Sequence, residues 1–430
     1  MRILVTGGAG FIGRAVIEAL LAEGHAVVAC CRTRGTAGER PGLEMLAFDL
    51  GGALTPESWR ARLDGVDAVV NAAGILRERR RGDFQRIHHA MPLALAEACR
   101  ARGIRFVQIS ALGDDRDGEF IRSKHRFDAA LLALDADAVV IRPSVVMSTR
   151  GSYGGTSLLR ALAALPGVLL LPGTGGQTIQ PILLEDLAAL VVRCARQAHA
   201  GPRVLHAVGP EILTVRDYLV AMRAWLGLPP ARVVEVPAFL VAGAAAIGER
   251  IGRGPLGATI AGMLERGNVG PPGAHAELGR ATGIAPRPLR EVLARSASFV
   301  QDRWHARLYL LRPLVRALLV VVWLVSGIAG LLATPAQYGA ILDAMAVPAS
   351  VQAPLVLATS VLDLVFAAAL LFASRRRPLV LVLMLVSVLA YTLGVGLLAP
   401  ALWLDPLGGL TKNLAVLGLL LVVLAIEDAR

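Results

Sequence analysis

Lysine and aromatic residues are scarce in this chain of 430 residues. Lys124 and Lys412 are the only lysines among 44 basic residues, and aromatic residues make up 5% of the chain. Proteins that bind nucleic acids combine basic stripes with interleaved aromatic side chains, whereas the arginines here are scattered along the sequence. The composition therefore argues against a nucleic-acid partner. Because arginine is the usual cation of this chain, each lysine is informative.

Metal-binding patterns are also missing. The cysteines Cys30, Cys31, Cys99 and Cys194 lack the paired spacing of a zinc site, and the eight histidines form no H-E-x-x-H motif. We expect no metal site and reduced, buried thiols. The apolar N-terminus is interrupted by glycines from Gly7 onward, unlike a signal peptide. The N-terminal domain is therefore expected to stay in the cytoplasm.

Charge is nearly absent from the last 120 residues, which hold 7 Lys+Arg and 5 Asp+Glu against 37 and 28 in residues 1–310. Each of four apolar runs is close to the ~20 residues that cross a bilayer. They predict membrane spans at 314–333, 351–373, 378–399 and 410–426. The chain is thus divided into a nucleotide-binding region with its cap at 1–300, a basic juxtamembrane segment at 301–312 and a membrane domain at 313–430.

The basic residues near the predicted spans lie before the first span and between the second and third: Arg303, Arg307, Arg312, Arg316, Arg375, Arg376 and Arg377. The connections 334–350 and 400–409 have none, and Lys412 is the one exception. Cytoplasmic loops carry an excess of basic residues, so both termini are predicted to face the cytoplasm. The net charge of +11 fits a surface that faces anionic lipid headgroups. The lipid bilayer is the first predicted partner.

A glycine-rich turn follows the first apolar segment. Residues 2–6 have the pattern of a buried strand, residues 7–13 read GGAGFIG, and a helical pattern continues to Gly24. In this context G-x-G-x-x-G predicts a dinucleotide site, because glycine permits the tight turn and the close approach of a pyrophosphate to the helix N-terminus. The predicted contacts are Gly7, Gly8, Gly10, Phe11, Ile12 and Gly13.

An arginine stands at the end of the second predicted strand. An acidic residue about 20 residues after the glycines would bind the ribose 2′-hydroxyl of NAD. Arg32 and Arg34 lie there instead, and a guanidinium pairs well with the 2′-phosphate of NADP. We predict NADP as the cofactor, with NAD as the other candidate. The alternative is that both arginines are solvated loop residues.

Further strand patterns lie around 45–48, 68–71, 105–110 and 138–141, with helical patterns between the later ones. This alternation predicts an α/β fold with a doubly wound parallel sheet, a Rossmann domain. Ligands of such sheets bind at the carboxyl ends of the strands. The mixed segment 144–298 is predicted to form a small cap region over that edge.

Four motifs carry a family resemblance: TGGAGFIG at 6–13, NAAG at 71–74, ISALG at 109–113 and RSK at 122–124. Together they resemble the extended or atypical short-chain dehydrogenase/reductases, in the branch related to the nucleotide-binding accessory subunit of respiratory complex I. The resemblance covers about residues 1–300.

This resemblance implies positions for the cofactor. Asp49 and Leu50 would lie near the adenine, and Ser110 would end the strand under the nicotinamide. The residues implied to line the cofactor between these points are Asn71, Ala72, Ala73 and Gly74.

The catalytic tyrosine that the resemblance implies is absent. In that family a tyrosine four residues before a lysine acts as general acid/base, and the lysine lowers the phenol pKa and holds the ribose. Lys124 matches the lysine, but Phe120 stands at the tyrosine position. Losing the hydroxyl typically costs about 10²–10⁴ in rate. Lys124 and Ser110 remain as catalytic candidates, and Lys124 can still bind the ribose.

Other residues near the gap are candidate substitutes: Asp114, Asp115, His125, Asp128 and Tyr153. Each also has a structural explanation, as a helix or loop cap, a solvated helix residue or a loop anchor. The sequence leaves both explanations open.

An acidic residue falls inside a predicted span. Asp363 is near the middle of the second span, where a charge costs about 2.5–3.5 kcal/mol and is a functional candidate. Ser387 and Tyr391 are one helical turn apart on the third span, and Ser326 is near the middle of the first. These residues predict either a polar site for a quinone, a lipid headgroup or protons, or interhelical hydrogen bonds alone.

The segment DPLGGLTKNL at 405–414, within a four-span unit, resembles the DoxX-like membrane family. Its fusion to an atypical reductase is a bacterial arrangement and implies the inner membrane and a respiratory or redox partner. Two main functions remain open. One is redox activity on a membrane-associated quinone, lipid or isoprenoid. The other is a non-catalytic NADPH-binding sensor or assembly protein, in keeping with Phe120.

Overall fold

The computed structural model describes residues 1–31, 40–78, 80–197, 203–250 (the backbone alone at 247–250), 266–373, 376–405 and 409–427. The chain divides into two compact units, Met1–Arg307 and Leu308–Arg430. Each unit is described by itself.

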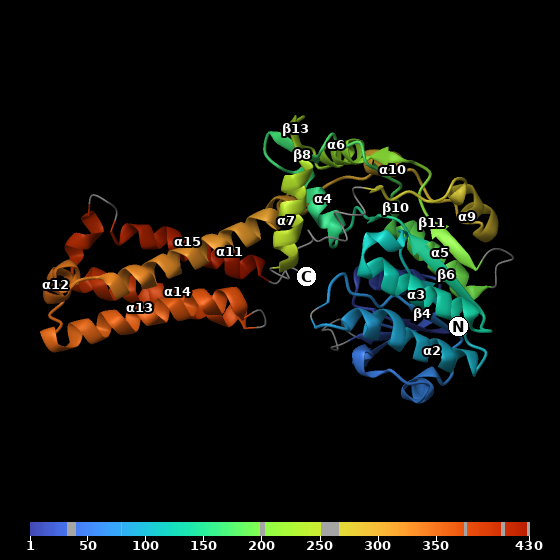
Figure 1. Ribbon diagram of the computed structural model, residues 1–430, viewed down its shortest axis with the longest axis horizontal. Coiled ribbons are helices and arrows are strands. Elements are labelled where there is room, and N and C mark those ends of the chain that lie inside the picture. The colour runs from blue at the N-terminus through green and yellow to red at the C-terminus, as the bar shows by residue number, and fades with distance from the viewer. Residues whose placement is uncertain are drawn as a thin grey trace. The chain divides into compact units, whose positions relative to one another are not determined.

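A seven-stranded sheet forms the centre of the first unit (Figure 1). Its strands are β1 (Arg2–Thr6), β2 (Ala26–Cys31), β3 (Leu43–Ala47), β4 (Ala68–Asn71), β5 (Arg105–Ile109), β6 (Ala138–Pro143) and β11 (Val204–Ala207). They pair in parallel in the order β11-β6-β5-β4-β1-β2-β3. The predicted doubly wound Rossmann sheet is confirmed. The order reverses at β1 and β4, where such sheets bind ligands.

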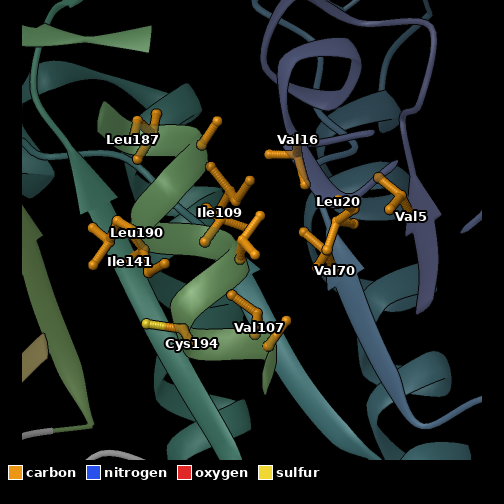
Figure 2. Close-up of a cluster of buried hydrophobic side chains, with 14 of the residues drawn as sticks. Val5, Val16, Leu20, Val70, Val107, Ile109, Ile141, Leu187, Leu190 and Cys194 are labelled. Carbon is orange, nitrogen blue, oxygen red and sulfur yellow. The ribbon is translucent and has the colours of Figure 1, made fainter. Parts of the chain in front are cut away.

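Helices cover both faces of the sheet because its strands alternate apolar side chains between them. Ile3 and Val5 belong to the core beneath α1 (Phe11–Ala22) and α5 (Leu184–Arg196), while Leu4 belongs to the core on the opposite face. Figure 2 shows Leu187 and Leu190 of α5 pointing toward the strands that carry Ile109 and Ile141. The opposite face carries α2 (Met91–Arg100) and α3 (Glu119–Ala133).

The four cysteines are free and lie in these two cores. Burial raises the pKa of Cys30, Cys99 and Cys194 to about 12. These thiols are therefore protonated at neutral pH.

A smaller subdomain completes the first unit and has its own core, which includes the buried Tyr218 and Leu219. Its helices are α4 (Gly155–Ala163), α6 (Val215–Trp225), α7 (Ala238–Arg250) and α10 (Leu289–Arg295), whereas α9 (Ala274–Thr282) packs on the central sheet through Leu278. Its strands form parallel pairs, β7 (Val146–Met147) with β10 (Ile182–Leu183) and β8 (Val168–Pro172) with β13 (Arg232–Val236), and one antiparallel pair, β9 (Thr178–Ile179) with β12 (Leu213–Thr214).

The second unit is helical, as predicted. It contains most of α11 (Val300–Leu332), then α12 (Pro335–Ala344), α13 (Ala349–Phe372), α14 (Arg377–Leu398) and α15 (Thr411–Ile426). Among the described residues, α11, α13 and α14 are long and apolar enough to cross a membrane, whereas α15 is a shorter apolar helix of 16 residues. The fourth span stays a prediction. At Gly327 of α11 a Cβ atom would lie 2.8 Å from the Ser360 carbonyl of α13, so the missing side chain lets these helices approach closely.

A buried ion cluster joins three of these helices. Glu427, which follows α15, accepts hydrogen bonds from Arg316 of α11 and Arg377 of α14, each at 2.6 Å. The side chains of Glu427 and Arg377 are both 8% exposed. Removing one partner of a buried ion pair leaves an uncompensated charge.

We predict that Glu427→Gln destabilises the second unit by about 3 kcal/mol, since both arginines lose their counter-charge. Thermal unfolding of the full-length protein in detergent measures this effect. Asp343→Asn is the matched control, because the carboxylate of the exposed Asp343 accepts a hydrogen bond only from Gln352 among the described contacts. Equal midpoints for both variants would contradict the prediction.

Candidate functional site

The residues predicted to bind a cofactor follow the carboxyl ends of the central strands. Gly7 follows β1, Ala72 follows β4 and Ser110 follows β5. These strands are parallel and neighbouring, so their carboxyl ends lie at one edge of the sheet, at the point where the strand order reverses.

The glycine turn closes tightly on itself. Gly7 has φ +67°, and a Cβ atom on it would lie 2.7 Å from the Ala72 carbonyl oxygen, while the Gly10 N–H donates to the Gly7 oxygen at 2.8 Å. A Cβ atom on Gly13 would collide with that same Gly7 oxygen. Gly10 is the N-cap of α1 and has no side chain to cap it. The first turn of α1 thus fits a pyrophosphate, which needs free N–H groups at a positive helix end.

A chain of buried side chains runs across three strands beneath this edge. Thr6 donates to the Asn71 Oδ1 atom at 2.5 Å, and Asn71 donates to the Gln108 Oε1 atom at 2.7 Å. Both ends of the Asn71 side-chain amide are therefore hydrogen-bonded to side chains of the neighbouring strands. Asn71 fixes the turn at residues 72–74, which passes beside Gly7.

Lys124 is buried at the same edge. Its side chain points to the end of β5, where Nζ donates to the Ile109 carbonyl oxygen at 3.0 Å, and its Nζ lies 5.9 Å from the centre of the Phe120 ring. A Cβ atom on Gly74 would lie 3.4 Å from Nζ, so the turn after β4 also reaches this amine. Burial lowers the pKa of Lys124 to about 8, while the Asp128 carboxylate opposes the shift. Residues 120 and 124 therefore lie one turn apart on the same face of α3, as their spacing predicts.

His88 is a part of the site that the sequence did not reveal. It lies on a π-helix (Gln85–Ala90) before α2, where a single helix was expected. Its Nε2 accepts from the Ile75 N–H at 3.0 Å, so the neutral ring carries its proton on Nδ1 and donates to Ser123 Oγ at 2.8 Å. The ring stacks on Phe84 at 5.1 Å and meets Phe120 edge-on at 5.5 Å. Burial, and then the charge of Lys124, lower the pKa of His88 to about 2.

The Ser110 side chain is oriented by a hydrogen bond to a buried carboxylate. Its hydroxyl donates to Asp128 Oδ2 at 2.7 Å, and the same oxygen accepts from Arg142 Nε at 2.9 Å. Asp128 is completely buried. Because the Ser110 hydroxyl gives its hydrogen to Asp128, its oxygen is left to accept hydrogen bonds from other groups.

The remaining candidate substitutes for tyrosine have identifiable contacts. Tyr153 is 55% exposed and stacks on Phe11 with ring centres 6.5 Å apart. His125 donates from Nε2 to the Ala111 carbonyl oxygen at 3.0 Å, and its Nδ1 lies 3.4 Å from Asp115. Asp114 caps the short turn that follows it. His125 is thus partly buried and hydrogen-bonded, unlike the solvated helix residue considered from the sequence.

Two other predicted sites are only partly described. Asp49 caps the turn Leu50–Gly52 by accepting from the Gly51 N–H at 3.1 Å, and Leu50 is buried. Arg32 and Arg34 lie outside the described residues. Their pairing with a 2′-phosphate stays a prediction.

In the second unit, Asp363 accepts a hydrogen bond from Ser326 of α11 at 2.6 Å. Tyr391 of α14 is 58% exposed, and Ser387 is half-buried. The interhelical hydrogen bond considered for Asp363 therefore has a described partner. A polar site that also includes Ser387 and Tyr391 stays a prediction.

Comparison with known proteins accounts for both units. Residues 3–207 match the NAD dependent epimerase/dehydratase family, and residues 320–421 match the DoxX-like family. The chain joins an epimerase-type domain to a DoxX-like domain. The predicted family resemblance and the oxidoreductase-like, NAD(P)-binding character of the first unit are confirmed.

Several relatives share the first unit. The ceramide reductase of Caulobacter vibrioides is 27% identical over 56% of this chain and 76% of its own length. The divinyl chlorophyllide a 8-vinyl-reductase of Oryza sativa is 30% identical over 55% and 61% of the two chains. Subunit 9 of the NADH dehydrogenase [ubiquinone] 1 alpha subcomplex of Mus musculus is 26% identical over 48% and 56%. The chain thus spans about three fifths of the last two relatives.

Solved structures agree with the fold. UDP-glucose 4-epimerase from Thermotoga maritima has a TM-score of 0.51 with 16% identity, over 68% of this chain and 96% of that one. At this identity the likeness shows the fold alone.

The buried His88 predicts a sensitivity to acid. Its pKa falls from 6.5 in the unfolded chain to about 2 on folding, so the unfolded state binds more protons between these values. The stability that His88 contributes is therefore present above pH 6.5 and is lost as the pH falls toward 2. His88→Gln should reduce the slope of unfolding free energy against pH by up to about 1.4 kcal/mol per pH unit. Urea unfolding of the full-length protein at pH 4–7 measures the slope, and an unchanged slope would contradict the prediction. His275→Gln is the control.

Proposed function

We propose that this protein is a membrane-anchored, NADP(H)-binding reductase of the atypical class that acts on a hydrophobic, membrane-associated substrate such as a quinone, a lipid or an isoprenoid. The buried Lys124 beside the turn at Gly74, in a chain with helices of membrane-spanning length, carries this proposal. The epimerase-type domain supports a nicotinamide cofactor. The choice of NADP over NAD depends on Arg32 and Arg34.

The residues at the sheet edge divide the work of holding the cofactor. The N–H groups of the first turn of α1 bind the pyrophosphate, and Arg32 and Arg34 bind the 2′-phosphate. Lys124 binds the ribose hydroxyls. The Ser110 oxygen, whose lone pairs are free, accepts a hydrogen bond from the cofactor. Bound NADPH supplies the hydride of such a reaction.

An apolar cluster next to Lys124 suits a lipid-like substrate. Phe84, Phe120 and Ile121 are buried together, and Ile75 and Ala111 pack against them. Two relatives are named ceramide reductase and divinyl chlorophyllide a 8-vinyl-reductase, and the first of these names refers to a lipid. We infer a substrate of comparable hydrophobicity for this chain.

Proton transfer falls to Lys124 in this proposal. Phe120 has no proton to give, and His88, with a pKa of about 2, stays neutral at physiological pH and already donates its one proton to Ser123. With its pKa lowered to about 8, the Lys124 ammonium releases a proton more readily than an ordinary lysine does.

The membrane parts of the proposal follow the predicted topology. Residues 313–430 cross the membrane four times, residues 301–312 contact the cytoplasmic headgroups, and both termini lie in the cytoplasm. The location is the bacterial inner membrane, next to a respiratory or other redox partner. The DoxX-like match and the three long apolar helices support the membrane association.

A non-catalytic NADPH sensor or assembly protein is the second candidate, and one observation favours it. Phe120 is packed into the aromatic cluster with Phe84 and His88, so the tyrosine position serves packing rather than proton transfer. Turnover separates the two candidates, because both bind the cofactor. The purified protein is mixed with NADPH and with quinones or lipid extract in detergent, and NADPH oxidation is followed at 340 nm. No oxidation under any condition would favour the sensor.

Phe120→Tyr should raise NADPH oxidation by about 10²–10⁴, since the new hydroxyl is carried by a ring whose centre lies 5.9 Å from the Lys124 Nζ. The double variant Phe120→Tyr/Lys124→Met is the matched control and should lose the gain. Activity that appears only with Phe120→Tyr, from a wild type with none, would overturn the reductase proposal and leave the sensor.

Arg32→Asp should weaken NADPH binding by roughly 10- to 100-fold, because a charge-assisted pair with the 2′-phosphate is lost. NADH binding should change far less. Titration of the full-length protein with both cofactors, followed by nucleotide fluorescence, measures the difference. Arg40→Asp makes the same change of charge at an exposed residue and is the control. Equal losses for the two cofactors with Arg32→Asp would refute the choice of NADP.

A further inference from the structure

Helix α7 presents an apolar face to solvent. Residues 238–248 read AFLVAGAAAIG and carry no charge. Ala245 is buried and Val241, one turn earlier, is half-buried, so this side of the helix is covered. On the other side Phe239 is 72% exposed and Ala242 is also exposed. An exposed phenylalanine on an uncharged stretch of helix indicates an interaction surface.

The covalent connection of the first unit to α11 indicates what covers this face of α7. Helix α11 begins at Val300 in the first unit and runs to Leu332 as one of the helices of membrane-spanning length. If α11 enters a bilayer, as the proposed function requires, that bilayer is tethered directly to the first unit. A second copy of the chain has no comparable tether.

The start of α11 has the residue types of a membrane interface. Trp304 is 60% exposed and Phe299 is 63% exposed, and arginines stand at 303 and 307. Tryptophan is enriched at the headgroup level, and arginine binds anionic headgroups. Residues 1–310 also carry a net charge of +9, from 37 basic and 28 acidic residues. The first unit is therefore complementary to an anionic lipid surface.

We propose that α7 is an interfacial helix that docks the nucleotide-binding unit on the lipid bilayer. Its face with Phe239 and Ala242 inserts at the boundary between headgroups and acyl chains, parallel to the surface. The unit then has two attachments to the membrane, α7 and the α11 span. A substrate that leaves the bilayer beside α7 enters the unit that holds the cofactor.

Site-directed spin labelling of the full-length protein tests this docking. A nitroxide is attached to Phe239→Cys in nanodiscs of phosphatidylcholine and phosphatidylglycerol. The four native cysteines are buried, so they do not compete for the label. Val220→Cys on α6, where Val220 is 51% exposed, is the aqueous control, and Val325→Cys on α11, where Val325 is 59% exposed, is the bilayer reference.

The measured quantity is the ratio of nitroxide accessibility to oxygen and to a water-soluble nickel complex. Docking predicts a ratio at residue 239 several-fold higher than at residue 220 and approaching that at 325. A ratio at 239 equal to that at 220, with 325 in the bilayer, overturns the docking alone. Shielding of 239 from both reagents overturns it in favour of a protein partner, such as a second copy. An aqueous ratio at 325 overturns the membrane anchoring as well.

Discussion

The burial of one ammonium group governs the arrangement of the candidate site. Lys124 lies out of contact with bulk water, and an ammonium in such a place requires acceptors and the absence of a competing charge. The Ile109 carbonyl at the end of β5 supplies the acceptor, and Gly74, which has no side chain, leaves room for the amine. His88 stays neutral beside it, because a second positive charge there would raise the cost of burial further. The end of β5 and α3 are thus joined through one side chain, and the turn after β4 passes close to its amine.

Most of the sheet could be predicted from the sequence. Its central strands are buried on both faces, so they appear as short continuous apolar runs, as in residues 68–71. The glycine turn could be predicted because its steric demands exclude every other residue type at Gly7 and Gly13. Lys124 was recognisable since lysine is so rare in this chain.

The parts that escaped prediction depend on contacts between distant residues. His88 receives its role from Ile75, 13 residues away, and from Ser123, 35 residues away, and no local pattern announces either contact. The π-helix that carries it has only 6 residues, too few for its period to be distinguished from that of an α-helix in the sequence. Helix α12 lies in a connection between predicted spans and is begun by a capping box at Thr334 and Gln337, a polar signal that apolar periodicity does not detect. Glu427 was counted only as a charge, although it joins arginines from two other helices.

The burial of the cysteines restricts the thiol redox chemistry in which this chain can take part. A thiol exchanges disulfides as its thiolate and only where another sulfur can reach it. All four thiols are packed inside the sheet layers, and burial keeps three of them protonated up to a pKa of about 12. Oxidants in the surrounding compartment therefore reach these sulfur atoms only when the domain unfolds locally. A disulfide relay through the cysteines of this chain would therefore require local unfolding of the sheet layers.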